Sequence, residues 1–184
     1  MVRLIAALLD ARDTYTLGHA ARVSRMSCDF ARILKIEEGE IARLERAALL
    51  HDIGKVQIPD SILRKRGKLN AKQEELMREH PVTGANILWL APILHQYIPV
   101  VRAHHEWHDG NGYPDGLKGD QVPLHARIIS LADVFDAMTS DRPYRRALST
   151  IEATEEILRV SGTQFDGGMA EEFVQMVGDP GWNP

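Results

Sequence analysis

The sequence predicts an all-α domain, and three observations support this. Apolar residues recur at helical spacing along most of the chain, as in the stripe formed by Val23, Met26, Phe30 and Ile33. Strand-like alternation is absent, and no internal repeat or low-complexity segment interrupts the pattern. With 184 residues, 44% of them hydrophobic, the chain can bury one sizeable core. We therefore expect residues 1–184 to form a single helical bundle.

Start and stop signals divide the chain into helices. Asn70 and Ser149 are suited to cap two N-termini, and Ser149 begins a capping box. Pro81 is typical of a first helical turn, so His80 is the expected N-cap of its helix. The expected helices cover about 4–9, 16–34, 38–52 with a stop at Gly54, 59–63, 71–79, 81–90, 99–105, 123–138, 150–160 and 170–177.

Glycines and a proline between Glu106 and Gly119 predict the one long loop of the chain. A long structured loop in a compact helical domain is more often functional than idle. Its Gly-Tyr-Pro segment, 112–114, either turns the chain with Tyr113 packed over it or forms a lip of a site.

Composition excludes several classes of protein. A net charge of −4 and a pI near 6.1 give no basic surface for a nucleic-acid polymer. The single cysteine, Cys28, excludes an internal disulfide and fits a reducing compartment. No apolar run approaches the ~20 residues that span a membrane, and the N-terminus lacks a signal-peptide layout. We expect a cytoplasmic protein, either one domain of a longer regulatory protein or a stand-alone version.

The chain is organised around the stretch HDIGK at 51–55. On a helix, Leu44, Ala47, Ala48 and His51 fall on one face, so His51 points towards the core. Asp52 follows at once, and an ionised carboxylate this close to a core needs a cation or strong hydrogen bonds. For this pair alone, a capped helix end with a satisfied core histidine is the simpler explanation.

Similar polar residues recur downstream at core-facing or helix-terminal positions, namely His80, His104, His105 and Asp133. Each has a separate structural explanation, but together they would require several buried polar partners, whereas one cluster of cations would satisfy all of them. Imidazole nitrogen and carboxylate oxygen suit Zn, Mn, Fe or Ni. Six ligands exceed one tetrahedral ion, which favours two metals. Two ions ~3.5–4 Å apart serve displacement at phosphorus, so the pattern predicts a phosphohydrolase.

Five motifs resemble the HD-GYP domain, a subgroup of the HD phosphohydrolase superfamily. They are DARDTYT (10–16) with His19, HDIGK (51–55), HP (80–81), HHE (104–106) with GNGYP (110–114), and DVFDAMTSDRPYR (133–145). The resemblance runs from about Leu8 to Phe173. It implies an all-α bundle and a metal-dependent phosphodiesterase that hydrolyses the bacterial second messenger cyclic di-GMP to pGpG or GMP. A hydroxide bridging two metals would attack the phosphorus.

The resemblance also implies residue roles. A two-metal centre with Asp52 as the bridge would be held by six ligands: His51, Asp52, His80, His104, His105 and Asp133. Lys55 would hold a phosphate oxygen and stabilise transition-state charge, so Asp52 and Lys55 are the expected catalytic residues. The expected substrate contacts are Lys55, Tyr113, His19, Arg142 and Arg145. The alternatives are a core or second-layer histidine at His19 and a solvated loop for the two arginines.

Some members of this family bind a third metal through a glutamate one helical turn before His19. Tyr15 occupies that position here and does not easily replace a carboxylate, so we expect two ions, Fe or Mn, with Ni or Zn as further candidates. A sensory or receiver domain, a signalling protein on the 112–114 loop and a homodimer are open as partners. Two other functions are also open: an HD phosphohydrolase for another nucleotide, and a cyclic di-GMP receptor without turnover.

Overall fold

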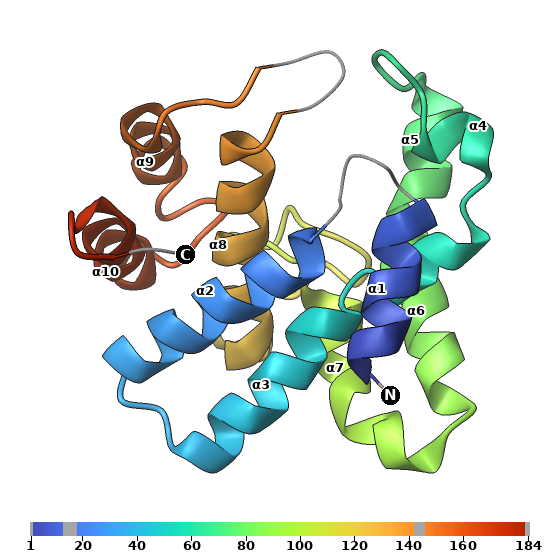
Figure 1. The fold of residues 1–184 in the computed structure, drawn as a ribbon, viewed down its shortest axis with the longest axis horizontal. Helices are drawn as coiled ribbons and strands as arrows, with labels where there is room; N and C mark the ends of the chain where they lie inside the picture. The colour runs from blue at the N-terminus through green and yellow to red at the C-terminus, as the bar shows by residue number, and fades with distance from the viewer. Residues whose placement is uncertain (1, 13–17, 142–145, 183–184) are drawn as a thin grey trace.

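The structure is a computed structural model that describes residues 2–12, 18–141 and 146–182. Helices dominate these ranges, and their only strand-like pairing is an isolated bridge between Ser161 and Phe165. The α-helices are α1 Val2–Arg12, α2 His19–Ile33, α3 Glu38–Leu50, α4 Asp60–Leu63, α5 Ala71–Arg78, α6 His80–Trp89, α7 Ile98–Ala103, α8 Leu124–Thr139, α9 Thr150–Arg159 and α10 Gly167–Gly178. Within the described ranges, three 3-10 helices join them: η1 Ile53–Gln57, η2 Pro92–Tyr97 and η3 Gly119–Gln121. The all-α prediction is confirmed (Figure 1).

The core lies where α2, α8 and α10 meet. Phe173 of α10 packs edge-on against Phe30 of α2, with ring centroids 5.2 Å apart, and against Phe135 of α8 at 5.8 Å. Edge-to-face pairs of this kind add to the gain from removing apolar surface from water. In Figure 1, α2 and α3 cross the front of the bundle, and α4 to α6 form its right-hand side. This frame fixes the helix ends from which the site is built.

The predicted caps have mixed outcomes. Asn70 and Ser149 both cap as predicted, each in a capping box. The prediction that His80 caps α6 is wrong, because the N-cap is Glu79 and His80 is the first helical residue. The ring of His80 turns back instead, and its Nδ1 donates to the carbonyl of Met77 at 2.8 Å. His80 therefore closes the end of α5 and leaves Nε2 pointing elsewhere.

The prediction that α3 continues to a stop at Gly54 is also wrong. The α-helix ends at Leu50, and Gly54 lies inside η1. A Cβ at Gly54 would lie 1.9 Å from the carbonyl oxygen of His80 and 2.6 Å from the backbone nitrogen of Gly84. Glycine is required there because η1 and α6 approach each other more closely than a side chain allows.

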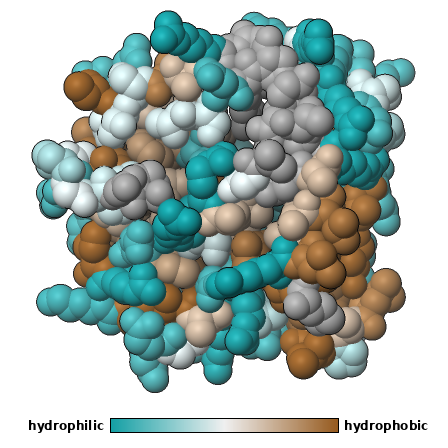
Figure 2. All heavy atoms as spheres, in the orientation of Figure 1, coloured by the Kyte–Doolittle hydropathy of each residue, from teal (hydrophilic) through white to brown (hydrophobic). Residues whose placement is uncertain are grey.

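The surface is largely polar. Figure 2 shows apolar side chains gathered on the side of this face where α1 and α6 lie. Leu4 and Leu8 of α1 are each 64% exposed. Across the described ranges, no helix combines the length and apolarity that a membrane span requires.

Candidate metal centre

The six predicted ligands come from four regions of the chain and meet inside the bundle. His51 and Asp52 lie at the junction of α3 and η1, and His80 begins α6. His104 and His105 follow α7, and Asp133 lies within α8. Three helix ends and the middle of α8 thus bring together side chains that are up to 82 positions apart in the sequence, from His51 to Asp133.

The candidate ligand atoms form two groups. In one, which we call the all-histidine group, one nitrogen from each of His80, His104 and His105 lies within 4.8 Å of the others. In the other, the mixed group, a ligand atom from each of His19, His51 and Asp133 meets the same limit. Three convergent imidazole or carboxylate donors are a typical ligand set for a transition-metal ion.

Asp52 lies between the two groups. Its Oδ1 is 3.3 Å from Nε2 of His80, on the all-histidine side. Its Oδ2 is 3.3 Å from Nε2 of His51 and 3.9 Å from Nε2 of His19, on the mixed side. Each carboxylate oxygen therefore faces a different group, as a residue that bridges two ions must.

Backbone contacts orient three of the imidazoles. Nδ1 of His51, His80 and His104 each donates to the carbonyl three residues earlier, at 2.6, 2.8 and 2.7 Å respectively. This turns Nε2 of each ring towards the centre, where Nε2 of His80 and Nε2 of His104 lie 3.2 Å apart, and metal-binding histidines are usually fixed in this way. Nε2 of His51 is buried and makes no hydrogen bond of good geometry among the described residues, although Oδ2 of Asp52 lies 3.3 Å away. A proton or a metal ion on this nitrogen would satisfy both the imidazole and the carboxylate.

His19 is held in the same way by a carboxylate. Its Nδ1 lies 2.7 Å from Oδ2 of Asp136, and Asp136 also accepts from Nε of Arg22 at 2.6 Å. Nε2 of His19 is 3.3 Å from Oδ1 of Asp133. The structure thus places His19 in the mixed group, closer to the centre than the second-layer role weighed from the sequence. The spacing of Asp136 one turn after Asp133 places both carboxylates on one face of α8, but the contact with His19 spans 117 positions and has no local signal.

The two groups differ in their protonation. Burial and the neighbouring imidazoles hold the pKa of His104 well below its usual value, and burial with His80 lowers the pKa of His105 to about 3. Burial opposes a charge on His19, but the hydrogen bonds to Asp133 and Asp136 outweigh it and raise its pKa to about 10. For His51, burial is outweighed by the charge of Asp52, and its pKa is also raised.

Both buried aspartates favour the ionised form. Burial disfavours the charge on Asp52, but Lys55 and His51 outweigh it and hold its pKa well below the usual range. In Asp133 the hydrogen bond and charge of His19 overcome burial in the same direction. Nζ of Lys55 is 2.5 Å from Oδ2 of Asp52, so the predicted catalytic pair is in contact.

The 112–114 loop covers one side of the all-histidine group. The ring of Tyr113 stacks on His105 with centroids 4.9 Å apart and an interplanar angle of 25°, and the guanidinium of Arg78 lies 4.8 Å from the tyrosine ring centroid. The buried carboxylate of Glu106 accepts from three consecutive backbone N–H groups, those of residues 115–117. A Cβ at Gly112 would lie 2.2 Å from the backbone nitrogen of Trp107. The loop is therefore tightly built, with Tyr113 against a candidate ligand.

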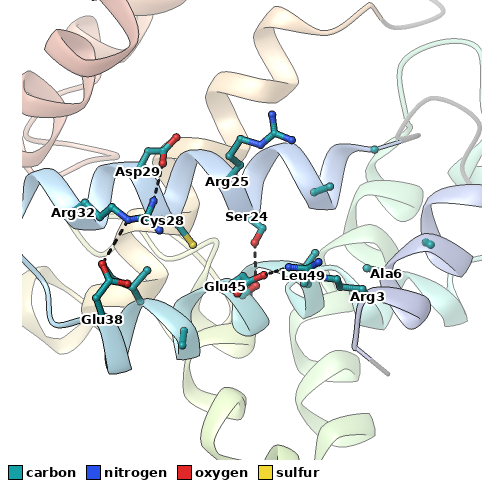
Figure 3. A pocket seen from close by; sticks show the side chains of 15 residues that line it. Arg3, Ala6, Ser24, Arg25, Cys28, Asp29, Arg32, Glu38, Glu45 and Leu49 are labelled. Atoms are coloured by element: carbon teal, nitrogen blue, oxygen red, sulfur yellow. Dashed lines mark hydrogen bonds and ion pairs between the residues drawn. The ribbon is translucent and has the colours of Figure 1, made fainter. Parts of the chain in front are cut away.

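Some sequence predictions are not placed by the structure. Arg142 and Arg145, expected to contact substrate, and Tyr15, expected to prevent a third metal, lie outside the described residues. A pocket of about 660 Å³ lies apart from the candidate ligands, between α1, α2 and α3 (Figure 3). Arg3 and Glu45 pair on its lining at 2.7 Å, and none of the six predicted ligands lines it. Its position gives it no part in the chemistry of the centre.

Comparison with known proteins decides the family. The family model for the HD domain matches residues 3–169. The chain belongs to this HD domain family. The family expected from the motifs is thereby confirmed.

Curated relatives of this HD domain include known phosphodiesterases. The cyclic di-GMP phosphodiesterase response regulator RpfG of Xanthomonas campestris is 40% identical over 166 residues, which are 88% of this chain and 43% of that protein. A cyclic di-GMP phosphodiesterase of Thermotoga maritima is 37% identical over 178 residues, 96% of this chain and 48% of the relative. The chain thus spans less than half the length of these two relatives.

Solved structures share the fold. The crystal structure of a cyclic GMP-AMP specific phosphodiesterase from Vibrio cholerae aligns with a TM-score of 0.72 at 22% identity, covering 98% of this chain and 49% of the other. An HD-GYP-type protein from Bdellovibrio bacteriovorus, Bd1817, aligns with the same TM-score at 21% identity, over 88% and 52% of the two chains. At these identities the likeness supports the helical architecture.

Proposed function

We propose that this HD domain is a metal-dependent phosphodiesterase that hydrolyses cyclic di-GMP to pGpG, GMP or both. The observation that carries the proposal is the position of Asp52, whose two carboxylate oxygens face two separate groups of ligand atoms. Relatives at 37–40% identity that are named cyclic di-GMP phosphodiesterases support the substrate.

The donor set fits two divalent transition-metal ions, Fe or Mn, with Ni or Zn as further candidates. His80, His104 and His105 would hold one ion, His51 and Asp133 would hold the other with His19 beside them, and Asp52 would serve both. Such ions acidify a bound water and neutralise charge on a phosphate oxygen. Nε2 of His51, buried and 3.3 Å from Oδ2 of Asp52, is positioned to share an ion with that carboxylate.

The protein's own groups then have distinct tasks. Lys55 holds a phosphate oxygen of the substrate and stabilises the charge that develops there. Ionised Asp52 and the neutral rings of His104 and His105 keep lone pairs available at neutral pH. Water adds to phosphorus, the bond to the 3′-oxygen breaks, and that oxygen takes a proton from solvent water. Tyr113 and His19, with Arg142 and Arg145 outside the described residues, are proposed substrate contacts.

The test is turnover by purified protein loaded with Mn, Fe or Ni, with the linear product followed by chromatography. We expect cyclic di-GMP to disappear as pGpG or GMP forms. His51→Ala is expected to lose metal and activity together, whereas His95→Ala is expected to keep both, since His95 stacks on Trp89 away from the centre. Absence of turnover with all three metals would contradict the proposal.

A second substrate is favoured by one relative. The 3′3′-cGAMP-specific phosphodiesterase 3 of Vibrio cholerae is 40% identical over 148 residues, 80% of this chain and 32% of that protein. A panel of cyclic di-GMP, 3′3′-cGAMP, nucleoside phosphates and alarmones separates these substrates. Calorimetric binding of cyclic di-GMP without hydrolysis would instead favour a receptor.

The expected partners and setting are part of the proposal. A cyclic dinucleotide is the proposed small-molecule partner, and no nucleic-acid polymer is expected. An attached sensory or receiver domain, a signalling protein at the 112–114 loop, a homodimer and a cytoplasmic location are predictions that binding and localisation experiments can check.

A further inference from the structure

Arg12, the last residue of α1, reaches across to the segment that carries Lys55. Its Nη1 donates to the carbonyl oxygen of Lys55 at 3.3 Å and also to that of Val56. Its Nη2 donates to the carbonyl of Ile58 at 2.9 Å, and Nε donates to Oδ1 of Asp60 at 3.0 Å. One guanidinium therefore contacts four residues at and just beyond the end of η1.

These contacts supply donors to carbonyls at the end of η1: those of Val56 and Ile58, and that of Lys55, which also accepts from the backbone N–H of Ile58 at 3.0 Å. Carbonyls in the last turn of a helix lack donors from the following turn. Arginine presents five N–H donors in a rigid fork, so one side chain can serve several carbonyls at once. A lysine in the same place offers a single nitrogen. The geometry at Arg12 therefore depends on the guanidinium and not on charge alone.

The beginning of η1 is fixed by a close backbone contact with α6. Gly54 packs so closely on α6 that a Cβ there would lie 1.9 Å from the carbonyl oxygen of His80. Lys55 follows directly, and its own carbonyl is bound by Arg12. Lys55 is thus held between a backbone contact with α6 and a side-chain contact from α1.

From this arrangement we propose that Arg12 is a positioning residue for Lys55. The guanidinium fixes the backbone of η1 so that Nζ of Lys55 stays beside Asp52, 2.5 Å from its Oδ2. The inference rests on the proposed function of Lys55 and assigns a role to the arginine of the DARDTYT motif, which the candidate ligands leave unexplained. Displacement of α1 would consequently move a catalytic group.

The test compares Arg12→Gln and Arg12→Lys with a matched control on the same helix, Arg3→Gln. Arg3 pairs with Glu45 of α3 at 2.7 Å and does not reach η1. In metal-loaded protein, we expect faster hydrogen exchange at 53–58 in both Arg12 variants and unchanged exchange there in the control. Thermal melts followed by circular dichroism establish that each variant folds. If Arg12→Gln does not fold, the same measurements are made on Arg12→Lys, which keeps the positive charge and one donor nitrogen.

Kinetics separate positioning from a general structural effect. Arg12→Gln is expected to lower kcat about tenfold to a hundredfold, with a smaller change in KM and unchanged metal content, because a small misplacement of a catalytic group is costly. In a Lys55→Ala background, Arg12→Gln is expected to cause no further loss. Equal losses in both backgrounds, loss of metal, or unchanged exchange at 53–58 would each overturn the proposal.

The two proposals fail separately. If wild-type protein does not turn over any cyclic dinucleotide, the proposed function fails. Hydrogen exchange then still decides whether Arg12 fixes the Lys55 segment: faster exchange supports the contact and unchanged exchange overturns it.

Discussion

The two groups of the candidate centre balance their charge in opposite ways. In the all-histidine group, burial and neighbouring imidazoles lower the pKa of His104 and His105. In the mixed group, nearby carboxylates overcome burial and raise the pKa of His19 and His51. Protons on imidazole thus satisfy the aspartates of the mixed group, whereas in the all-histidine group the rings of His104 and His105 are neutral.

Because of this difference, an ion must meet different conditions to bind at each group. A cation entering the all-histidine group meets neutral rings at His104 and His105 and displaces no proton from them. A cation entering the mixed group must displace the protons that the carboxylates hold on His19 and His51. The two ions are therefore expected to bind with different affinities and different dependence on pH, and Asp52 couples them.

Replacement of Asp52 is the largest expected perturbation, because it removes the residue common to both groups. Asp52→Asn is expected to abolish turnover and lower the metal content of both groups, measured by elemental analysis and product formation. Asp133→Asn is the matched comparison and should deplete only the mixed group. Equal metal content in wild-type protein and Asp52→Asn would contradict a shared carboxylate.

Asp136→Asn is expected to have an intermediate effect confined to the mixed group. The carboxylate of Asp136 holds Nδ1 of His19 at 2.7 Å, and loss of such a partner typically lowers metal affinity about 10- to 100-fold. Competition with a chelator measures the two affinities. Asp120→Asn, at a residue paired with Arg127 on the surface, is the control. If Asp136→Asn lowered the metal affinity of both groups equally, the two groups could not be separate metal sites.

The smallest expected effect is proton release at pH 7.5. Because the pKa of His19 is raised from 6.5 to about 10, the metal-free ring is protonated, and its stabilising contribution is complete below pH 6.5 and lost as pH rises through 10. Occupation of the mixed group should release the protons held on His19 and His51, and its affinity should rise with pH. Occupation of the all-histidine group should release no proton from His104 or His105. Calorimetry in buffers of different ionisation enthalpy measures the number of protons released at each group. Equal proton release at the two groups would contradict the difference in their protonation.

The sequence predicted most of the helices well and singled out six polar side chains that the structure brings close together, because both inferences depend on local features. The helices could be predicted because apolar residues recur at helical spacing. The polar residues of the centre could be recognised because they interrupt this apolar pattern. The close approach of η1 to α6 at Gly54 was missed, since it depends on tertiary contact and local sequence suggested only a helix stop. His80 was misassigned as a cap because its ring turns back to Met77. The place of His19 depends on Asp136, 117 positions away, a contact that no local pattern reveals.

The central claim is that two metal ions share the carboxylate of Asp52. It can be tested by anomalous X-ray diffraction from crystals grown with Mn²⁺, with data collected above the manganese absorption edge. We expect two anomalous peaks ~3.5–4 Å apart on either side of the Asp52 carboxylate. One peak should be ligated by His80, His104 and His105, and the other by His51 and Asp133. A single peak, or two peaks that do not share Asp52, would contradict it.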